Sequence, residues 1–203
     1  MIRAFLAVQL SEPLRATLAA IQSDVKRGIS QELSRDTSVS WVRPVAFHLT
    51  VKFLGDIDEG LVTPLRDAIA DALSGHRLIE IPLNHFGAFP NRQQPRVLWM
   101  GPSEQWEKSE DAARLAALHD SVEACCESLN LAPETKPLSA HLTLARVKGG
   151  HRAVGRALAK SGAMDRPLDA GSLPVDAIVL MRSELNPRGS IYTVLWESRL
   201  QIT

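Results

Sequence analysis

The sequence is poor in cysteine, has no net charge and lacks a long apolar run, and each absence excludes a class of protein. Its two cysteines, Cys125 and Cys126, are neighbours that cannot close the usual disulfide loop, so a disulfide-stapled secreted fold is not expected. Lysine plus arginine and aspartate plus glutamate each total 23, which excludes a broad basic surface for nucleic acid. A small basic pocket for a nucleic-acid end stays compatible with this balance.

No stretch approaches the roughly 18 apolar residues of a membrane span, and the apolar run over residues 1–10 is too short for a signal segment. We therefore expect a cytoplasmic protein that contacts no membrane. Of the 203 residues, 45% are hydrophobic and 23% are charged, which is typical of a globular chain with its own core. We expect residues 1–203 to form a single domain and a monomer.

Two short sequences occur twice in the same order, which indicates an internal repeat. His-Leu-Thr stands at 48–50 and 141–143, and Val-Leu-Trp stands at 97–99 and 194–196. A period of about 95 residues is too long for a solenoid unit. The repeat instead predicts two similar lobes that face each other around an approximate twofold axis.

The hydrophobic periodicity predicts that both repeats alternate between helices and strands. The lobes are expected to correspond to residues 1–110 and 111–203. The expected strands cover residues 4–10, 47–54, 78–83, 96–100, 141–146, 175–182 and 192–196. The expected helices cover residues 14–25, 61–73, 115–129 and 152–160, and loops are expected over 28–40, 87–95 and 133–139.

The repeated motif places an imidazole beside a hydroxyl on each of two strands. Residues i and i+2 of a strand share a face about 7 Å apart, so His48 lies beside Thr50, and His141 lies beside Thr143. Across a twofold axis the two pairs meet in one cleft. One imidazole can then act as an acid and the other as a base, while the hydroxyls donate to anionic oxygens. This arrangement suits in-line displacement at phosphorus.

Other interpretations of the histidines stand beside this one. A single His-x-Thr occurs often by chance, and paired histidines can also bind zinc. No further histidine, aspartate or glutamate lies at ligand spacing near either motif, and its recurrence in the same context favours a catalytic pair. We therefore expect neither a metal nor a cofactor.

The two motifs, together with their flanking segments, resemble a known family. His48-Leu-Thr-Val and His141-Leu-Thr-Leu are similar to the double His-x-Thr-x signature of the 2H phosphoesterases. Further segments resemble the RNA 2′,3′-cyclic phosphodiesterases of bacteria and archaea, which are also called 2′-5′ RNA ligases. These segments are residues 3–7, 48–55, 87–99, 141–146 and 183–185, followed by Tyr192.

The resemblance implies a bilobal α+β fold in which two antiparallel sheets line a central cleft and the helices lie outside. It implies hydrolysis of a terminal 2′,3′-cyclic phosphate to a 2′-phosphomonoester without a metal. In this family the first motif supplies the proton donor and the second the acceptor, which assigns these roles to His48 and His141. Thr50, Thr143 and Arg146 would bind the phosphate. The residue types alone do not separate the acid from the base.

Two cationic residues near the motifs have open assignments. Strict alternation turns Arg146 to the face opposite His141, so its role at the phosphate needs a β-bulge or a strand end near Ala145. Lys52 shares the face of His48 under strict alternation. It either adds positive charge to the substrate site or is a solvated strand lysine.

Several other residues are weaker candidates. Trp41, Phe47 and Tyr192 could stack on a base, although packing in the core or at its rim is the alternative for each. Arg43 and Arg188 lie in expected loops and either contact phosphates or face solvent. The remaining histidines are expected to be structural or exposed, and Trp99 and Trp196 are expected in the core.

Three functions remain open at this point. The first is a hydrolase for RNA with a 2′,3′-cyclic phosphate end, such as a tRNA fragment, or for cyclic nucleotides. The second keeps the fold but performs 2′-5′ RNA ligation or acts on another cyclic phosphate. The third is a non-catalytic module that binds RNA ends, against which two intact histidines argue because binding alone requires no acid or base.

Overall fold

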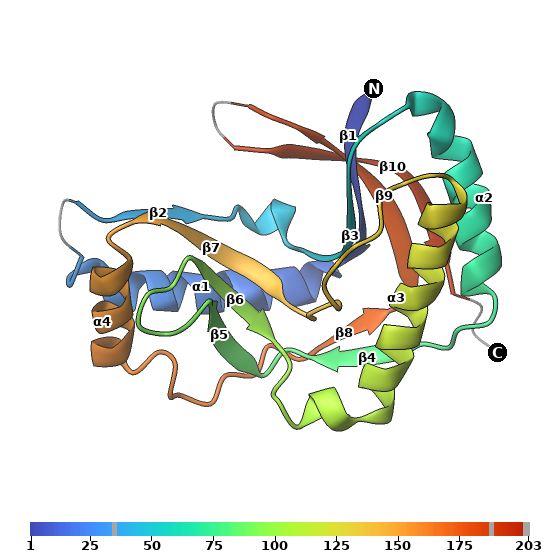
Figure 1. The fold of residues 1–203 in the computed structure, drawn as a ribbon. Helices are drawn as coiled ribbons and strands as arrows, with labels where there is room; N and C mark the ends of the chain where they lie inside the picture. The colour runs from blue at the N-terminus through green and yellow to red at the C-terminus, as the bar shows by residue number, and fades with distance from the viewer. Residues whose placement is uncertain (34–35, 187–188, 201–203) are drawn as a thin grey trace.

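The computed structural model describes residues 1–33, 36–186 and 189–200 and shows an antiparallel α+β fold (Figure 1). The strands are β1 (Ile2–Gln9), β2 (Ser38–Trp41), β3 (His48–Ile57), β4 (Ile79–Pro82), β5 (His85–Phe89), β6 (Val97–Gly101), β7 (Leu142–Gly149), β8 (Ser172–Val175), β9 (Ala177–Glu184) and β10 (Ile191–Arg199). The helices are α1 (Glu12–Ser30), α2 (Val62–Leu73), α3 (Glu110–Ser128) and α4 (His151–Ser161). Short 3-10 helices cover Pro44–Ala46, Glu59–Leu61 and Trp106–Lys108.

Among the described residues, one large sheet consists of two half-sheets that meet at the centre. The strand order is β10-β9-β1-β3-β7-β6-β5, and β2 pairs with β7. Strands β3 and β7 are joined through the single register pair Leu49–Leu142. We call β10-β9-β1-β3 the His48 half-sheet, and β2 with β7-β6-β5 the His141 half-sheet. A separate two-stranded sheet pairs β4 with β8.

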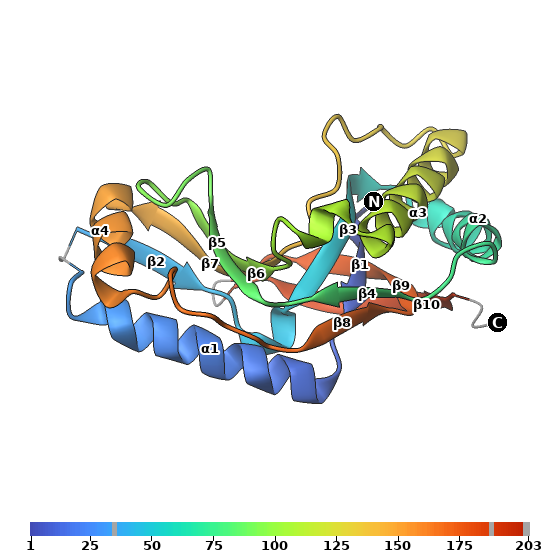
Figure 2. The same ribbon diagram turned by 90° about the horizontal axis from the view of Figure 1, so that it is seen from below.

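The helices are distributed so that each lobe contains one helix from each half of the chain. Helices α1 and α4 contact each other at one end of the molecule, and α2 and α3 at the other, as Figures 1 and 2 show. The two sequence repeats, approximately residues 1–110 and 111–203, therefore each contribute one helix to each lobe. The chain crosses between the lobes within each repeat.

The two Val-Leu-Trp segments also occupy different places in the sheet. Residues 97–99 lie in β6, which pairs directly with β7. Residues 194–196 lie in β10, which pairs with β9 at the outer edge. Only the His-Leu-Thr repeat therefore marks positions that face each other across the centre.

The two neighbouring cysteines lie in α3, as the helical pattern of the sequence predicted. Cys126 is buried in α3 and Cys125 is partly buried, and both thiols are free. Burial is the largest effect on Cys126 and raises its pKa to about 12, which makes it a packing residue rather than a nucleophile.

No helix in the described part of the chain is both long and apolar enough to cross a membrane.

Candidate active site

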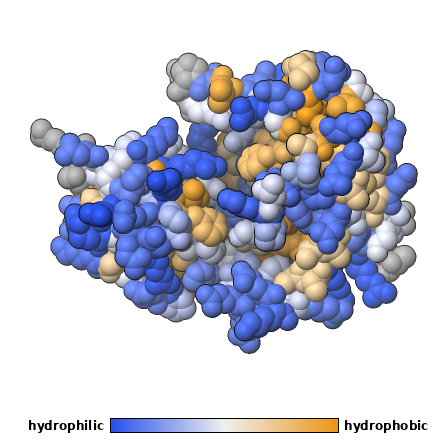
Figure 3. Space-filling view, in the orientation of Figure 1, coloured by the Kyte–Doolittle hydropathy of each residue, from blue (hydrophilic) through white to orange (hydrophobic). Residues whose placement is uncertain are grey.

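The two half-sheets enclose a cavity of about 430 Å³ that brings the predicted site residues together. His48, Thr50, His141 and Thr143 line it, together with Arg146. Figure 3 shows this face of the molecule hollowed between the lobes, with apolar residues on the right-hand wall. No carboxylate occurs among the described residues that line the cavity, which favours an anionic ligand.

The pairing of β3 with β7 explains why the two motifs meet. Leu49 and Leu142, the central residues of the motifs, are opposite each other in antiparallel register and are buried on the core side of the sheet. Because side chains alternate along a strand, the residues flanking each leucine point to the other face. The imidazoles and hydroxyls of both motifs therefore emerge on one side of the sheet and line the cavity.

Each imidazole is oriented by a hydrogen bond to its own chain. His48 Nδ1 lies 2.8 Å from the carbonyl oxygen of Ala46, and His141 Nδ1 lies 2.9 Å from that of Ser139. A carbonyl oxygen only accepts, so Nδ1 carries the proton in both rings. Nε2 is consequently the nitrogen that is left to accept or donate a proton to a ligand.

Burial lowers the pKa of both imidazoles below their ordinary value of 6.5. The carbonyl oxygens of Ala46 and Ser139 partly oppose this effect, while the positive charge of Arg146 lowers both pKa values further. The charge of His141 also lowers the pKa of His48. Protonation of His141 therefore disfavours protonation of His48.

Replacing Arg146 by glutamine should raise the pKa of both imidazoles, because a cation that repels the protonated rings is removed. NMR titration of the imidazole resonances in the free protein measures this directly. Arg3→Gln is the matched control, since Arg3 lines the same cavity but is not among the causes of either shift. A pKa that stays or falls in Arg146→Gln would contradict the assigned electrostatic coupling.

A β-bulge at the same place in each motif decides which later side chains enter the cavity. The register with neighbouring strands slips between Thr50 and Lys52, and again between Thr143 and Ala145, which leaves one extra residue at this place in each strand. The extra residue reverses the alternation beyond it. Arg146 thereby turns to the cavity, as its expected role requires.

The equivalent bulge in β3 turns Lys52 away from the cavity. The expectation that Lys52 lies on the substrate side with His48 is therefore wrong. Lys52 is 1% exposed and does not line the cavity. The fifth residue after each histidine occupies the cavity wall instead. This residue is Phe53 in the first motif and Arg146 in the second.

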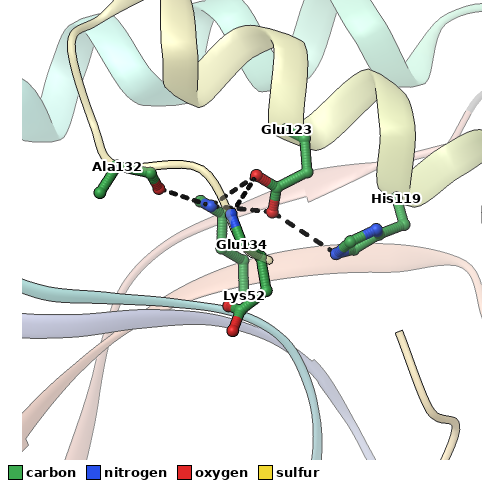
Figure 4. A network of polar contacts seen from close by, with 5 residues as sticks. All are labelled: Lys52, His119, Glu123, Ala132 and Glu134. Carbon is green, nitrogen blue, oxygen red and sulfur yellow. Dashed lines mark hydrogen bonds and ion pairs between the residues drawn. The ribbon is translucent and has the colours of Figure 1, made fainter. Parts of the chain in front are cut away.

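Lys52 instead lies at the centre of a buried polar network (Figure 4). Its Nζ donates to both carboxylate oxygens of Glu123 in α3, at 2.8 and 2.7 Å, and to the carbonyl of Ala132 at 2.9 Å. The Glu134 N–H donates to the same carboxylate, and His119 Nε2 lies 3.5 Å from it. All three ammonium protons are satisfied, so the network ties β3 to α3 and to the segment that leads to His141.

Aromatic rings hold each imidazole, and sequence analysis did not identify most of them. The His48 ring contacts both Phe5 and Tyr192, whose ring centroids lie 4.8 and 5.2 Å from its own. His141 contacts Phe89, whose centroid is 5.1 Å away and which stacks on Trp99. The Trp99 indole lies so close to Gly87 that a Cβ there would be 2.2 Å from the ring.

Arg3, Phe5 and Phe53 are cavity-lining residues that sequence analysis missed. The alternation of Arg3 and Phe5 along β1 is a usable signal, because both fall on the face opposite the core residues Ala4 and Leu6. Phe53 carries no such signal, since only the bulge brings it to the cavity.

The remaining candidates divide between the cavity, its surroundings and the core. Tyr192 lines the cavity, and Arg43 is exposed in a loop, where it donates to the carbonyl of Ser190 at 2.9 Å. Phe47 and Trp196 are buried in the core, and Trp41 is partly buried against it. Trp99 is partly buried beside His141 rather than enclosed in the core, and Arg188 lies outside the described residues. The histidines outside the cavity are His76, His85, His119 and His151.

Protein-bound metal ions are commonly held by three or more histidine, cysteine, aspartate or glutamate side chains. No three such residues come together in the described part of the chain. The two catalytic candidates therefore have no third protein ligand with which to bind zinc.

Two imidazole–hydroxyl pairs that face one cavity across a joined pair of half-sheets define a two-histidine, or 2H, phosphoesterase. Comparison with known proteins identifies the family within this class. The sequence pattern described as LigT like Phosphoesterase matches residues 8–99 and 107–192, and the chain belongs to this family.

Relatives of similar length support this membership. The RNA 2′,3′-cyclic phosphodiesterase of Methanothermobacter thermautotrophicus is 34% identical over 98% of this chain and 99% of its own. That of Thermus thermophilus is 35% identical over 95% of this chain and 87% of its own.

Solved structures agree with the fold. The crystal structure of the Thermus thermophilus protein TT0787 covers 99% of both chains with a TM-score of 0.71 and 29% identity. Escherichia coli LigT complexed with 3′-AMP covers 98% of both chains with a TM-score of 0.64. At 18% identity the second likeness concerns the fold alone.

Proposed function

We propose that this protein hydrolyses the 2′,3′-cyclic phosphate at an RNA end to a 2′-phosphomonoester. The observation that carries the proposal is the placement of two Nδ1-anchored imidazoles, two hydroxyls and one guanidinium around a single cavity. The names of the relatives from Methanothermobacter and Thermus support the same activity. The chain needs no further protein group for acid–base hydrolysis of a strained diester.

The proposed reaction uses one histidine on each side of the phosphorus. His141 Nε2 accepts a proton from water, and the water oxygen forms a bond to phosphorus. The bond from phosphorus to the 3′ oxygen breaks, and His48 Nε2 donates the proton that this oxygen needs. The Thr50 and Thr143 hydroxyls and the Arg146 guanidinium stabilise the charge that develops on the remaining phosphate oxygens.

The aromatic side chains of the cavity support a nucleotide as the ligand. Phe53 is 61% exposed on the wall, although a large apolar side chain is usually buried. Its ring centroid lies 6.1 Å from that of Phe5, and Tyr192 lines the same cavity. An exposed ring beside a phosphate site fits stacking on a base, which tolerates any base identity.

The purified protein should hydrolyse a 2′,3′-cyclic mononucleotide in excess chelator and release only the 2′-phosphate isomer, as resolved by chromatography. Because kcat/KM reports the free enzyme, its alkaline limb should lie below 6.5, the ordinary imidazole pKa. Loss of turnover in chelator and its recovery with zinc would overturn the metal-free mechanism. Adding RNA with a free 5′ hydroxyl to the same assay detects ligation as a longer product.

A further inference from the structure

The active-site cavity continues into a second hollow along β2 and β7. This hollow has a volume of about 350 Å³ and shares Arg146, Ser190 and Tyr192 with the cavity. Its own walls are formed by Ser40, Trp41, Arg43 and Lys148. We call the surface made by Ser40, Arg43, Arg146 and Lys148 the β2–β7 groove.

The groove is cationic although the chain as a whole is neutral. Arg43, Arg146 and Lys148 line it, and none of the described residues lining it is an aspartate or glutamate. Within the described part of the chain, none of these three cations forms an ion pair with a carboxylate, whereas many other surface arginines do. Positive charge that is gathered without a protein partner favours an anionic ligand.

The cations are spaced along a regular strand. Beyond the bulge in β7, Arg146 and Lys148 are exposed on either side of buried Val147, so they share a face about 7 Å apart. Ser40 of β2 stands opposite Arg146 in register. Arg43 is held against the neighbouring loop by its bond to the Ser190 carbonyl. The groove therefore presents a row of donors that leads away from the two imidazoles.

We propose that the β2–β7 groove binds backbone phosphates of the nucleotides that precede the terminal cyclic phosphate. The inference rests on the proposed function and adds to it the surface along which the RNA strand leaves the cavity. A cyclic mononucleotide fills only the cavity, whereas a strand must pass its preceding phosphates out of it. Arg146 is the junction, because it lines both hollows.

Lys148→Ala tests the proposal, because Lys148 lines the groove but not the cavity. We compare kcat/KM for a short oligoribonucleotide ending in a 2′,3′-cyclic phosphate with that for a 2′,3′-cyclic mononucleotide. The oligonucleotide value should fall about fivefold, and its log–log slope against salt should flatten by about 0.7, the change for one lost phosphate contact on a single strand. The mononucleotide value should stay within about twofold of the unmodified protein.

Lys26→Ala is the matched control, since it removes an exposed lysine from α1, outside the groove. It should leave the ratio of the two substrates and the salt slope unchanged, and Lys148→Arg should restore both. An equal loss for both substrates, or an oligonucleotide effect no larger than that of Lys26→Ala, would overturn the proposal. Failure to hydrolyse either substrate before any substitution would instead overturn the proposed function.

Discussion

His48→Asn and His141→Asn should each lower kcat by about 10² to 10⁴-fold on a 2′,3′-cyclic nucleotide, with a much smaller change in KM. Each substitution removes an Nε2 atom proposed to transfer a proton. Apart from the other histidine, the titratable side chains among the described residues that line the cavity are arginines and Tyr192. An arginine stays protonated at working pH and cannot act as a base. Initial rates measured near the pH optimum give the effect.

Asparagine is chosen because its amide can donate to the carbonyl that Nδ1 contacts in the native chain, which is Ala46 for position 48 and Ser139 for position 141. The fold should therefore persist, which thermal unfolding checks. The double variant should be little worse than either single one, because an acid and a base that act in one step are not additive. Retention of turnover within a few fold in either variant would exclude that histidine from the proton transfers.

Lys52→Met should lower the free energy of unfolding by about 3–5 kcal/mol, because it leaves the partly buried Glu123 carboxylate without its ammonium partner. For a chain of this size that loss lowers Tm by about 10 °C. Lys52 touches no part of the cavity, so kcat on a cyclic nucleotide at a temperature well below Tm should change far less than in the histidine variants. Calorimetry and denaturant titration measure the loss.

The matched control is the double variant Lys52→Met with Glu123→Gln. Removing both charges should recover much of the stability, because a neutral amide costs less to leave unpaired than a carboxylate. A double variant as unstable as Lys52→Met would show that the loss comes from packing and not from charge.

The loss of stability at acid pH is a second measurement of the Lys52–Glu123 ion pair. Burial by itself raises the pKa of Glu123, but the bonds from Lys52 and the Glu134 N–H outweigh it and hold the pKa below the ordinary 4.5. Stability from a depressed carboxyl is present above its unfolded pKa and is lost as pH falls through the folded one. The unmodified protein should therefore lose this contribution below about 4.5, and the double variant should not.

The sequence was sufficient to predict the centre of the site because that prediction needed only local rules. Alternation placed His48 with Thr50 and His141 with Thr143, and the repeat placed the two pairs opposite each other. The structure brings all four to one cavity. The role of each residue in the reaction stays a prediction.

The orientation of the side chains that follow each His-Leu-Thr motif could not be predicted from strand alternation. The β-bulges after Thr50 and Thr143 depend on pairing with β1 and β6, which are distant in sequence. A bulge or a strand end near Ala145 was required to bring Arg146 into the cavity, and a bulge is present. The equivalent bulge in β3 was not foreseen, and this is why Lys52 was misplaced and Phe53 was overlooked.

The strands that were missed are short and lie in segments rich in serine, glycine or proline. β2 and β5 overlap the segments 28–40 and 87–95 that were expected to be loops, and β8 was not predicted apart from its last residue, Val175. Gly55 was expected to end the strand that begins near His48, yet β3 continues to Ile57 with a positive φ of 72° at that glycine. Tertiary pairing overrides local propensity at these places.

The single rung between Leu49 and Leu142 has a mechanical consequence. Because one register pair joins the half-sheets, we expect the backbone to be less stiff along that line, so that the distance between His48 and His141 depends on the elements that pack behind it. The Gln22 amide of α1 donates to the carbonyls of Val42 and Leu144 at 2.8 Å and so fixes this helix to the His141 half-sheet on one side of that line. We therefore expect the separation of the two imidazoles to depend on how the helices hold each half-sheet, and not on the pairing of β3 with β7 alone.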